Sequence, residues 1–526
     1  MKNKLLFLFI FLAMFTTSAQ AGFMETIPVG EGIYEWIYDY LDELYARGLI
    51  EGLHLGTKPY FRDQIAEELL SLREKIEEKQ ITVAWPESFL VQELEHEFSH
   101  EINQLKLQAN SPEKPEPIKE FFWGVDFEEK SNFKSRRRSV FRETCWPYVK
   151  AQIGSNFSLC TRYMLDENLA KDPNYDGKVW RGFAGDAAQA YLAFNLPYFK
   201  LFVGRDRLAW GQKGSGQLIL SQHAFPLDMI KIQGGWGIFQ GTAFFSILDP
   251  LSVHDSSETI YVKRYLSGHR VSLDLFSIAQ LGLSETVIYG GEDRFIEPYY
   301  VIPLFWYHGA QLNHGRDDNT FFGLDFKLRP KRGILLYAEF LIDDLQIEKK
   351  TQGDQEPDEL GYSGGLSLMD LFGINGVGLD LQYTRINNWT FNQKEEHNRY
   401  LHEKKLLGNP LGPDADNFGV GLSAWLKKGI KSKITYQLER RGEGRVDSPW
   451  NEPWMLTQGE YEEKFPSGVV EKLNYLSIAL QYNYANILRC ELSFDRFNFD
   501  NYQNIENQKK DFTQLNLSLS YHFLRM

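Results

Sequence analysis

The chain has 526 residues, of which 24% are charged, and its formal net charge is −14 at pH 7. This acidic balance argues against a general affinity for nucleic acid. No apolar run beyond the first residues reaches the length of a membrane-spanning helix, and the mean hydropathy is −0.39, which excludes a helical membrane protein. The three cysteines are too few for a disulfide framework. Cys145 and Cys160 could pair in an oxidising compartment, which would leave Cys490 over.

The first 21 residues have the pattern of a secretory signal peptide. Two lysines in the first four residues precede an apolar run over residues 5–15, and the small residues Ala19-Gln20-Ala21 follow. This run is too short to cross a bilayer as a helix. We expect residues 1–21 to be removed, so that the mature chain begins near Gly22.

Residues 22–118 are predicted to form a small periplasmic bundle of three helices followed by a linker. Each helix has an apolar stripe at spacings of three and four residues. The stripes are Ile33, Ile37, Leu41 and Leu44; Ile65, Leu69, Leu72 and Ile76; and Val91, Leu94, Phe98, Ile102 and Leu105. Gly48 has the position that commonly ends a helix, and the proline-rich residues 111–117 are expected to be the linker.

The third stripe contains the sequence His96-Glu97-Phe98-Ser99-His100, which matches the H-E-x-x-H motif of zinc proteases. On a helix, two such histidines lie one turn apart and could bind zinc, with the glutamate as general base. If Phe98 marks the centre of the apolar stripe, however, both histidines point away from the bundle. No third ligand stands out nearby. We therefore interpret the motif as a solvated helix face and expect no catalytic residue, metal or cofactor.

Residues 119–526 are predicted to form an all-β transmembrane antiparallel β-barrel. The clearest strand is 512–523, in which apolar and polar residues alternate without a fault. Leu515, Leu517, Leu519, Tyr521 and Phe523 are expected to face lipid, and Gln514, Asn516, Ser518 and Ser520 the lumen. Further strands are expected at about 321–328, 334–343, 362–370, 376–387, 418–427, 434–438, 476–482 and 488–494.

The connections between these strands alternate strictly in length. The short connections are 330–333, 372–373, 428–429 and 485–486, and the long ones are 344–361, 388–417, 440–470 and 498–511. Short periplasmic turns and long external loops are typical of barrels in the outer membrane of Gram-negative bacteria. Nine strands over residues 321–526 indicate about 18 in all at the same density. Closure of such a barrel leaves no backbone group unpaired in hydrocarbon.

The glycine-rich residues 204–216 suggest a phosphate-binding loop at first sight, but no G-K-[ST] sequence follows and the strand–helix context is missing. Their glycines and Trp210 instead predict a tight turn or a segment folded into the lumen.

This region also carries a resemblance to a known family. The matching segments are Gly204–Gly211, Leu218–Ser221, Ala224–Pro226, Gly268–Arg270, Leu281–Tyr289, Glu297-Pro298, Asp318-Asn319, Gly323–Phe326, Leu336–Glu339 and Asp343-Asp344. They resemble the Wzi capsule-assembly family of outer-membrane proteins. The resemblance implies a barrel that binds capsular or related exopolysaccharide at the cell surface and anchors the polymer without making or hydrolysing it. Polysaccharide export machinery would then be a possible partner of the helical bundle. Outer-membrane barrels commonly end on an aromatic residue, whereas Leu524-Arg525-Met526 follow Phe523 here.

Two of the predicted external loops contain the residue types that bind sugars. Loop 388–417 carries Trp389, Phe391, Tyr400 and His402, and loop 440–470 carries Arg440, Arg441, Arg445, Trp450, Trp454 and Tyr461. Flat rings can pack on sugar faces, and arginine pairs bidentately with carboxylates such as those of uronic acids. The candidate polysaccharide-binding residues are Trp389, Arg440, Arg441, Arg445, Trp450 and Trp454. The same aromatic residues would also suit an interfacial girdle or loop packing. The alternative function is a porin or transporter with an open lumen.

Overall fold

The computed structural model describes residues 24–110, 119–134, 140–154, 156–166, 169, 177–179, 184–211, 216–255, 258–346, 355–457, 461–484 and 487–525. The expected signal peptide, the expected linker at 111–117 and the expected turn at 485–486 lie outside these residues.

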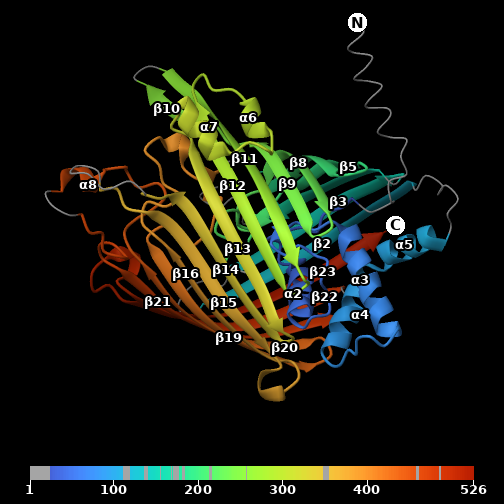
Figure 1. Ribbon diagram of the computed structural model, residues 1–526. Coiled ribbons are helices and arrows are strands. Elements are labelled where there is room, and N and C mark those ends of the chain that lie inside the picture. Colours follow the sequence, from blue (N-terminus) through green and yellow to red (C-terminus); the bar gives the residue numbers. More distant parts are fainter. Residues whose placement is uncertain are drawn as a thin grey trace, which may run out of the picture.

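Eighteen antiparallel strands form one closed barrel (Figure 1), because each pairs with the next and β23 pairs back with β2. The strands are β2 (Lys119–Lys134), β3 (Val140–Ile153), β4 (Phe157–Asp166), β5 (Ala184–Asn195), β6 (Lys200–Asp206), β8 (Leu227–Trp236), β9 (Phe239–Ile247), β11 (Glu258–Leu275), β12 (Ala279–Gly291), β13 (Asn319–Lys331), β14 (Ile334–Asp344), β15 (Glu359–Met369), β16 (Val377–Ile386), β19 (Ala415–Lys427), β20 (Ile430–Arg441), β21 (Glu471–Tyr484), β22 (Leu488–Asp500) and β23 (Lys510–Arg525). A short strand, β10 (Leu251–Asp255), extends β11 as a hairpin beyond the barrel.

The alternation of side chains along the last strand is as predicted. Leu515 and Tyr521 of β23 are exposed on the outer face, whereas the Asn516 side chain donates to Ser493 Oγ at 3.1 Å on the inner face. All nine strands expected between residues 321 and 526 are present, and long and short connections alternate between them. A closed barrel with an apolar outer face is built to span an outer membrane, so the chain is an outer-membrane protein of a Gram-negative bacterium.

In the described residues 24–110, four helices precede the barrel: α2 (Glu35–Ala46), α3 (Arg62–Glu77), α4 (Glu87–Glu97) and α5 (Ser99–Asn110). The first two apolar stripes correspond to α2 and α3, but the third is divided between α4 and α5 by a break at Phe98 (φ −96°, ψ 17°). Its stripe residues from Val91 to Ile102 are nevertheless buried. Among the described residues, no helix is long and apolar enough to cross a membrane.

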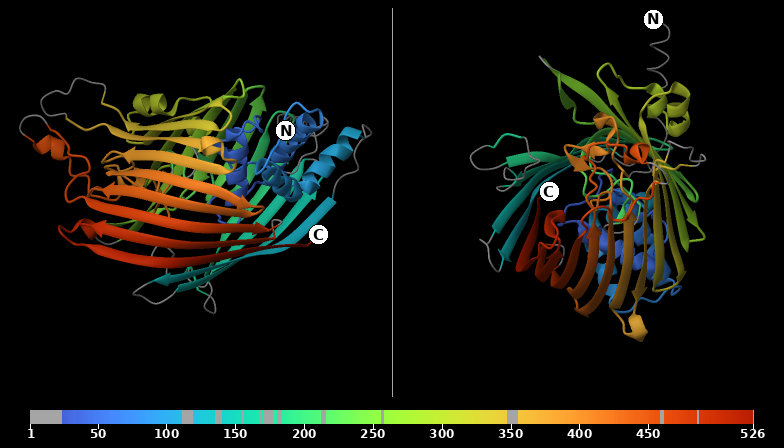
Figure 2. Two further views of the ribbon diagram at one scale, coloured as in Figure 1. Left: turned by 90° about the horizontal axis from the view of Figure 1, so that it is seen from below. Right: turned by 90° about the vertical axis from the view of Figure 1, so that its left-hand side faces the viewer.

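The helices pack directly onto the barrel. Helix α2 shares one apolar core with Leu335 and Trp425, which belong to the barrel strands β14 and β19. The buried guanidinium of Arg47 donates to Asp370 Oδ2 at 2.6 Å and to Glu43 Oε1 at 3.2 Å, and so ties α2 to the turn after β15. In the right-hand view of Figure 2, this blue N-terminal segment lies within the ring of strands.

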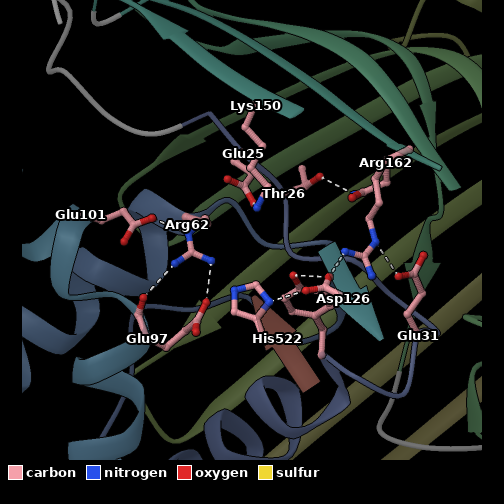
Figure 3. A network of polar contacts seen from close by, with 12 residues as sticks. Glu25, Thr26, Glu31, Arg62, Glu97, Glu101, Asp126, Lys150, Arg162 and His522 are labelled. Carbon is pink, nitrogen blue, oxygen red and sulfur yellow. Dashed lines mark hydrogen bonds and ion pairs between the residues drawn. The ribbon is translucent and has the colours of Figure 1, made fainter. Parts of the chain in front are cut away.

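Charged pairs fix the segment before α2 to the inner wall (Figure 3). Arg162 of β4 donates from Nε to Glu31 Oε2 at 2.9 Å and also pairs with Asp126 of β2. His522 of β23 contacts the same Asp126 carboxylate. The Tyr34 hydroxyl also donates to Asp126 Oδ2 at 3.1 Å, so the N-terminal segment is bonded to β2 and β4 from the inside of the barrel.

The glycine-rich connection after β6 folds into the lumen, as predicted. Its short strand β7 (Ala209–Trp210) pairs with β1 (Thr57–Lys58), which precedes α3. Trp210 is fully buried and shares a second apolar core with residues 218–220 and with side chains of the loop after β16. Gly204 has φ +141°, and a Cβ there would lie 2.2 Å from the Ala190 carbonyl oxygen, so only glycine fits.

Candidate functional site

Three tryptophans from two external loops meet at one place. Trp389 lies in the loop 387–414 between β16 and β19, and Trp450 and Trp454 lie in the loop 442–470 between β20 and β21. Their ring centroids are 5.1 Å (389–450), 5.2 Å (389–454) and 5.7 Å (450–454) apart, each pair edge to face. Such pairs are favourable because the positive edge of one ring meets the negative face of the next. We call Trp389, Trp450 and Trp454 the tryptophan cluster.

A glutamate holds the tryptophan cluster in position. Glu463 Oε1 accepts hydrogen bonds from Asn388 Nδ2 at 2.8 Å, Trp389 Nε1 at 3.0 Å and the Tyr461 hydroxyl at 3.2 Å. Burial raises the pKa of the Glu463 carboxyl, and these hydrogen bonds only partly oppose that rise. The two loops are thus joined through one polar group.

The rings of the tryptophan cluster differ in exposure. Trp389 and Trp454 are 7% and 3% exposed, whereas Trp450 is half-buried. Next to Trp454, the helix α8 (Pro453–Leu456) ends in the exposed Met455 and in Leu456, which is 82% exposed. A ligand approaching from outside would therefore contact Trp450 first, while the other two rings support it from below.

The three arginines predicted for this site lie in three different environments. Arg440 is opposite Asp416 in the β19–β20 register, on the outer face with the exposed Leu438, and donates to Asp416 Oδ1 at 2.9 Å. Arg441 is on the inner face, where NH2 donates to Glu439 Oε1 at 3.1 Å. Arg445 donates to the carbonyl oxygens of its own loop at 2.7 and 2.6 Å. Of the three, only Arg441 lines a cavity described below.

That cavity has a volume of about 260 Å³ and lies at the ends of β16, β19 and β20 that border the external loops. Its polar lining is formed by Thr384, Asn409, Asn417, Gln437, Glu439 and Arg441. We call it the loop cleft. Of these residues, only Arg441 was expected at the site. The alternation along β20 does contain the signal for two others, because Gln437, Glu439 and Arg441 share one face and Leu438 lies on the other.

The loop cleft and the tryptophan cluster belong to one packed unit. Asp414 accepts hydrogen bonds from the Gly444 amide at 2.9 Å and from the Ser467 amide and hydroxyl at 2.9 and 2.6 Å. These contacts join the end of the loop 387–414 to both ends of the loop 442–470. The two loops are therefore fixed relative to each other.

The other aromatic residues expected at the site have packing roles. Phe391 and Tyr400 stack with centroids 5.7 Å apart, and Tyr400 lies 4.1 Å from the Phe321 ring of β13. Both side chains are fully buried in the second apolar core. His402 Nδ1 lies 3.0 Å from Asp249 Oδ1. These residues pack inside the barrel beneath the external loops.

The residues of the H-E-x-x-H motif bond to charged side chains of α3 and β2. Glu97 Oε1 accepts from Arg62 NH1 at 2.8 Å (Figure 3), and His100 Nε2 lies 2.8 Å from Glu120 Oε2 of β2. Within the described ranges, no group of three or more His, Cys, Asp or Glu side chains could hold a metal ion. The motif therefore ties the helices to the barrel. Cys145, Cys160 and Cys490 are all free.

Comparisons with known proteins agree with this architecture. The family model described as "Capsule assembly protein Wzi" matches residues 122–512. Among solved structures, Wzi of Escherichia coli, described as an outer-membrane, carbohydrate-binding β-barrel involved in group 1 capsule assembly, aligns with a TM-score of 0.60 and 14% identity over 94% of this chain and 99% of that chain. OccD3 (OpdP) of Pseudomonas aeruginosa aligns with a TM-score of 0.46 and 11% identity over 80% of this chain and 98% of that chain. A comparison with curated protein sequences gave no match.

Proposed function

Because the chain belongs to the Wzi capsule-assembly family, whose model covers residues 122–512, we propose that it binds capsular or exopolysaccharide at its external loops and anchors the polymer to the cell. The observation that carries this proposal is that the two external loops bearing the tryptophan cluster and part of the loop cleft are joined to each other through Asp414. The carbohydrate binding named for the Escherichia coli relative supports it by analogy.

The chemistry of the two features is complementary for a sugar chain. The apolar faces of sugar rings pack on flat aromatic rings, for which Trp450 offers the accessible surface. Side-chain amides such as Asn409, Asn417 and Gln437 carry both donors and acceptors, so they can hydrogen-bond to sugar hydroxyls. Arg441 adds a cation that can pair with the carboxylate of an acidic sugar. We propose this division of roles in place of equal contributions from all three arginines.

We infer that anchoring, rather than transport or catalysis, is the role of this barrel. Both ends of the lumen contain packed apolar cores: α2 lies against Trp425 at one end, and Phe391 and Tyr400 lie against Phe321 at the other. A porin needs a continuous aqueous path, which such packing opposes. An anchor needs only a fixed barrel and an exposed binding surface.

The proposal is tested by replacing one ring and one cation together, Trp450→Ala with Arg441→Ala. Truncation of two central contacts costs about 2 kcal/mol or more, which corresponds to a roughly thirtyfold loss of affinity. We expect cells with this variant to release polymer into the medium while the total amount of polymer is unchanged. Polymer in the cell-bound and released fractions is measured by uronic-acid or hexose assay.

The matched control is Trp236→Ala with Arg73→Ala, which removes the same two residue types at exposed positions far from the loops: Trp236 ends β8 at a short turn and Arg73 lies on α3. Both variants must remain heat-modifiable on gels, which reports a folded barrel. Equal retention by the two variants would contradict the proposed site. A fall in total polymer would instead point to a role in synthesis.

A further inference from the structure

The connection between β12 and β13 lies against the outside of the barrel. It contains the helices α6 (Pro298–Val301) and α7 (Tyr307–His314), and Figure 2 (left) shows the yellow-green helix outside the row of strands. The alternation of side chains along β12 shows which face of the barrel wall this connection covers. Ser284 and Thr286 bond to groups in the lumen, whereas Leu283 is exposed on the opposite, outer face. Glu285 follows Leu283 on that outer face. We call residues 292–318 the outer clasp.

Polar and apolar contacts fix the outer clasp to the barrel wall. Glu285 accepts hydrogen bonds from the backbone amides of Tyr307 at 3.0 Å and His308 at 2.8 Å, where α7 begins. His269 of β11 lies 3.2 Å from the same carboxylate. Phe245, Tyr265, Val287 and Tyr289 of the wall form a buried core with Tyr300 and Tyr307 of the clasp. A carboxylate that would otherwise face outward from the wall is thus fully bonded.

The level of these contacts on the barrel follows from strand geometry. β12 starts at Ala279, directly after a short turn whose Phe276 is 90% exposed, as expected for an aromatic residue at the membrane interface. At about 3.3 Å per residue and a tilt of about 40°, the six residues from Ala279 to Glu285 rise about 15 Å along the membrane normal. The apolar band of such barrels is about 25 Å tall. The start of α7 therefore lies within the band.

The exposed side chains in the middle of the outer clasp are mainly apolar, whereas exposed charged residues lie at its two ends: Glu292 and Asp293 before α6, and Arg316 and Asp317 after α7. The exposed apolar side chains include Phe295, Ile302, Leu304, Phe305, Trp306 and Leu312. Leu304 is 93% exposed, which is costly in water. Directly below the clasp, the barrel wall presents the exposed Leu283, Leu324 and Phe326 to lipid. The apolar surface of the clasp therefore continues the lipid-facing surface of the wall.

We propose that the outer clasp is embedded in the outer leaflet of the membrane and that lipid acyl chains cover its apolar face. The clasp covers the outer face of the wall at the level of His269 and Glu285. It thereby shields these polar groups from hydrocarbon, in which an unsatisfied polar group is unfavourable. At the rim, exposed Lys263 lies 4.6 Å from the Phe295 ring centroid, in a position to reach lipid phosphates, as lysines at membrane interfaces do.

The proposal is tested with nitroxide spin labels on the full chain in vesicles of phosphatidylethanolamine and lipopolysaccharide. Cys145, Cys160 and Cys490 are first replaced by serine, and Leu304→Cys is then labelled. Leu324→Cys on β13 serves as the lipid reference, and Leu456→Cys on α8 as the aqueous reference. We expect the Leu304 label to be relaxed by oxygen in preference to a water-soluble nickel chelate, with the same ratio as the Leu324 label.

Leu312→Cys on α7 provides a second site if the Leu304 variant does not fold, as judged by heat-modifiability on gels. Preferential relaxation by the nickel chelate, as at Leu456, would overturn the proposal because the clasp would lie in water. Protection of both labels from oxygen and nickel alike would also overturn it, since a protein partner or a second copy would then cover the face. Labels that match Leu324 at both sites support it.

Discussion

Glu463 is the residue on which the arrangement of the tryptophan cluster depends most directly. Its carboxyl accepts three side-chain hydrogen bonds from both external loops, and burial raises its pKa above the usual value. A carboxyl with a raised pKa in the folded state binds protons on folding. Its contribution to stability is therefore fully present below the unfolded pKa and is lost as the pH rises through the folded pKa.

The loss of stability at higher pH gives a prediction for the packing of the two loops. The near-ultraviolet circular dichroism of the three coupled tryptophans should weaken as the pH rises beyond the usual range of a glutamate carboxyl, because ionisation of Glu463 loosens the packing. Glu463→Gln keeps an oxygen acceptor for Trp389 but cannot ionise, so its spectrum should change little with pH. If the variant and the original protein show the same pH dependence, Glu463 is not the titrating group.

Arg440 and Arg441 show that neighbouring residues of a strand lie on opposite faces of the barrel wall. The alternation that starts at Ile434 continues through Leu438 and places Arg440 on the outer face and Arg441 on the inner one. These opposite orientations were not predicted, because the loop boundary was placed at 440 and both arginines were therefore assigned to the loop. The three tryptophans were selected from the sequence because flat rings in external loops suit sugar faces. Their meeting at Glu463 was not predictable, because it depends on contacts between two loops.

The helices show a second limit of sequence periodicity. The apolar stripe passes through Phe98 without a change of phase, because Phe98 N–H still bonds to the Leu94 carbonyl and Ile102 N–H to that of Phe98. No proline or glycine marks the break between α4 and α5. Strand number and order, by contrast, were predictable from the alternation within strands and from loop lengths. The contact of α2 with the barrel was not, since it depends on a core shared with Trp425.

Helix α2 gives a prediction about stability. An Arg47→Met variant removes the cation bonded to Asp370 and one of the two cations bonded to Glu43, whose other partner is Lys431. Breaking a buried pair costs about 3 kcal/mol. We expect a lower midpoint in urea-induced unfolding, followed by the intrinsic fluorescence of the full chain. Arg73→Met is the matched control, because the Arg73–Glu77 pair is exposed and is worth about 1 kcal/mol at most. Equal shifts for both variants would show that Arg47 does not secure the helix.

Two separate apolar cores pack inside the barrel, and we propose that each of them acts as a seal of the lumen. One is the core shared by α2 and the wall, and the other is the core of Trp210, Phe391 and Tyr400 beneath the external loops. Each seal is apolar and close-packed, so hydrated ions should not pass either one. A filled lumen suits a surface anchor, whereas a porin needs an open aqueous path through its barrel.

Two seals in series predict the electrical behaviour of the protein in planar bilayers. The unmodified chain should show no steady, large conductance steps, in contrast to a general porin recorded in the same membranes. The Arg47→Met variant should also remain nearly non-conducting, because loosening α2 leaves the seal around Trp210 intact. Steady porin-sized steps from the unmodified chain would contradict the anchor function. Steady steps from the Arg47→Met variant alone would show that α2 is the only effective seal, and that the external loops enclose a passage to the outside.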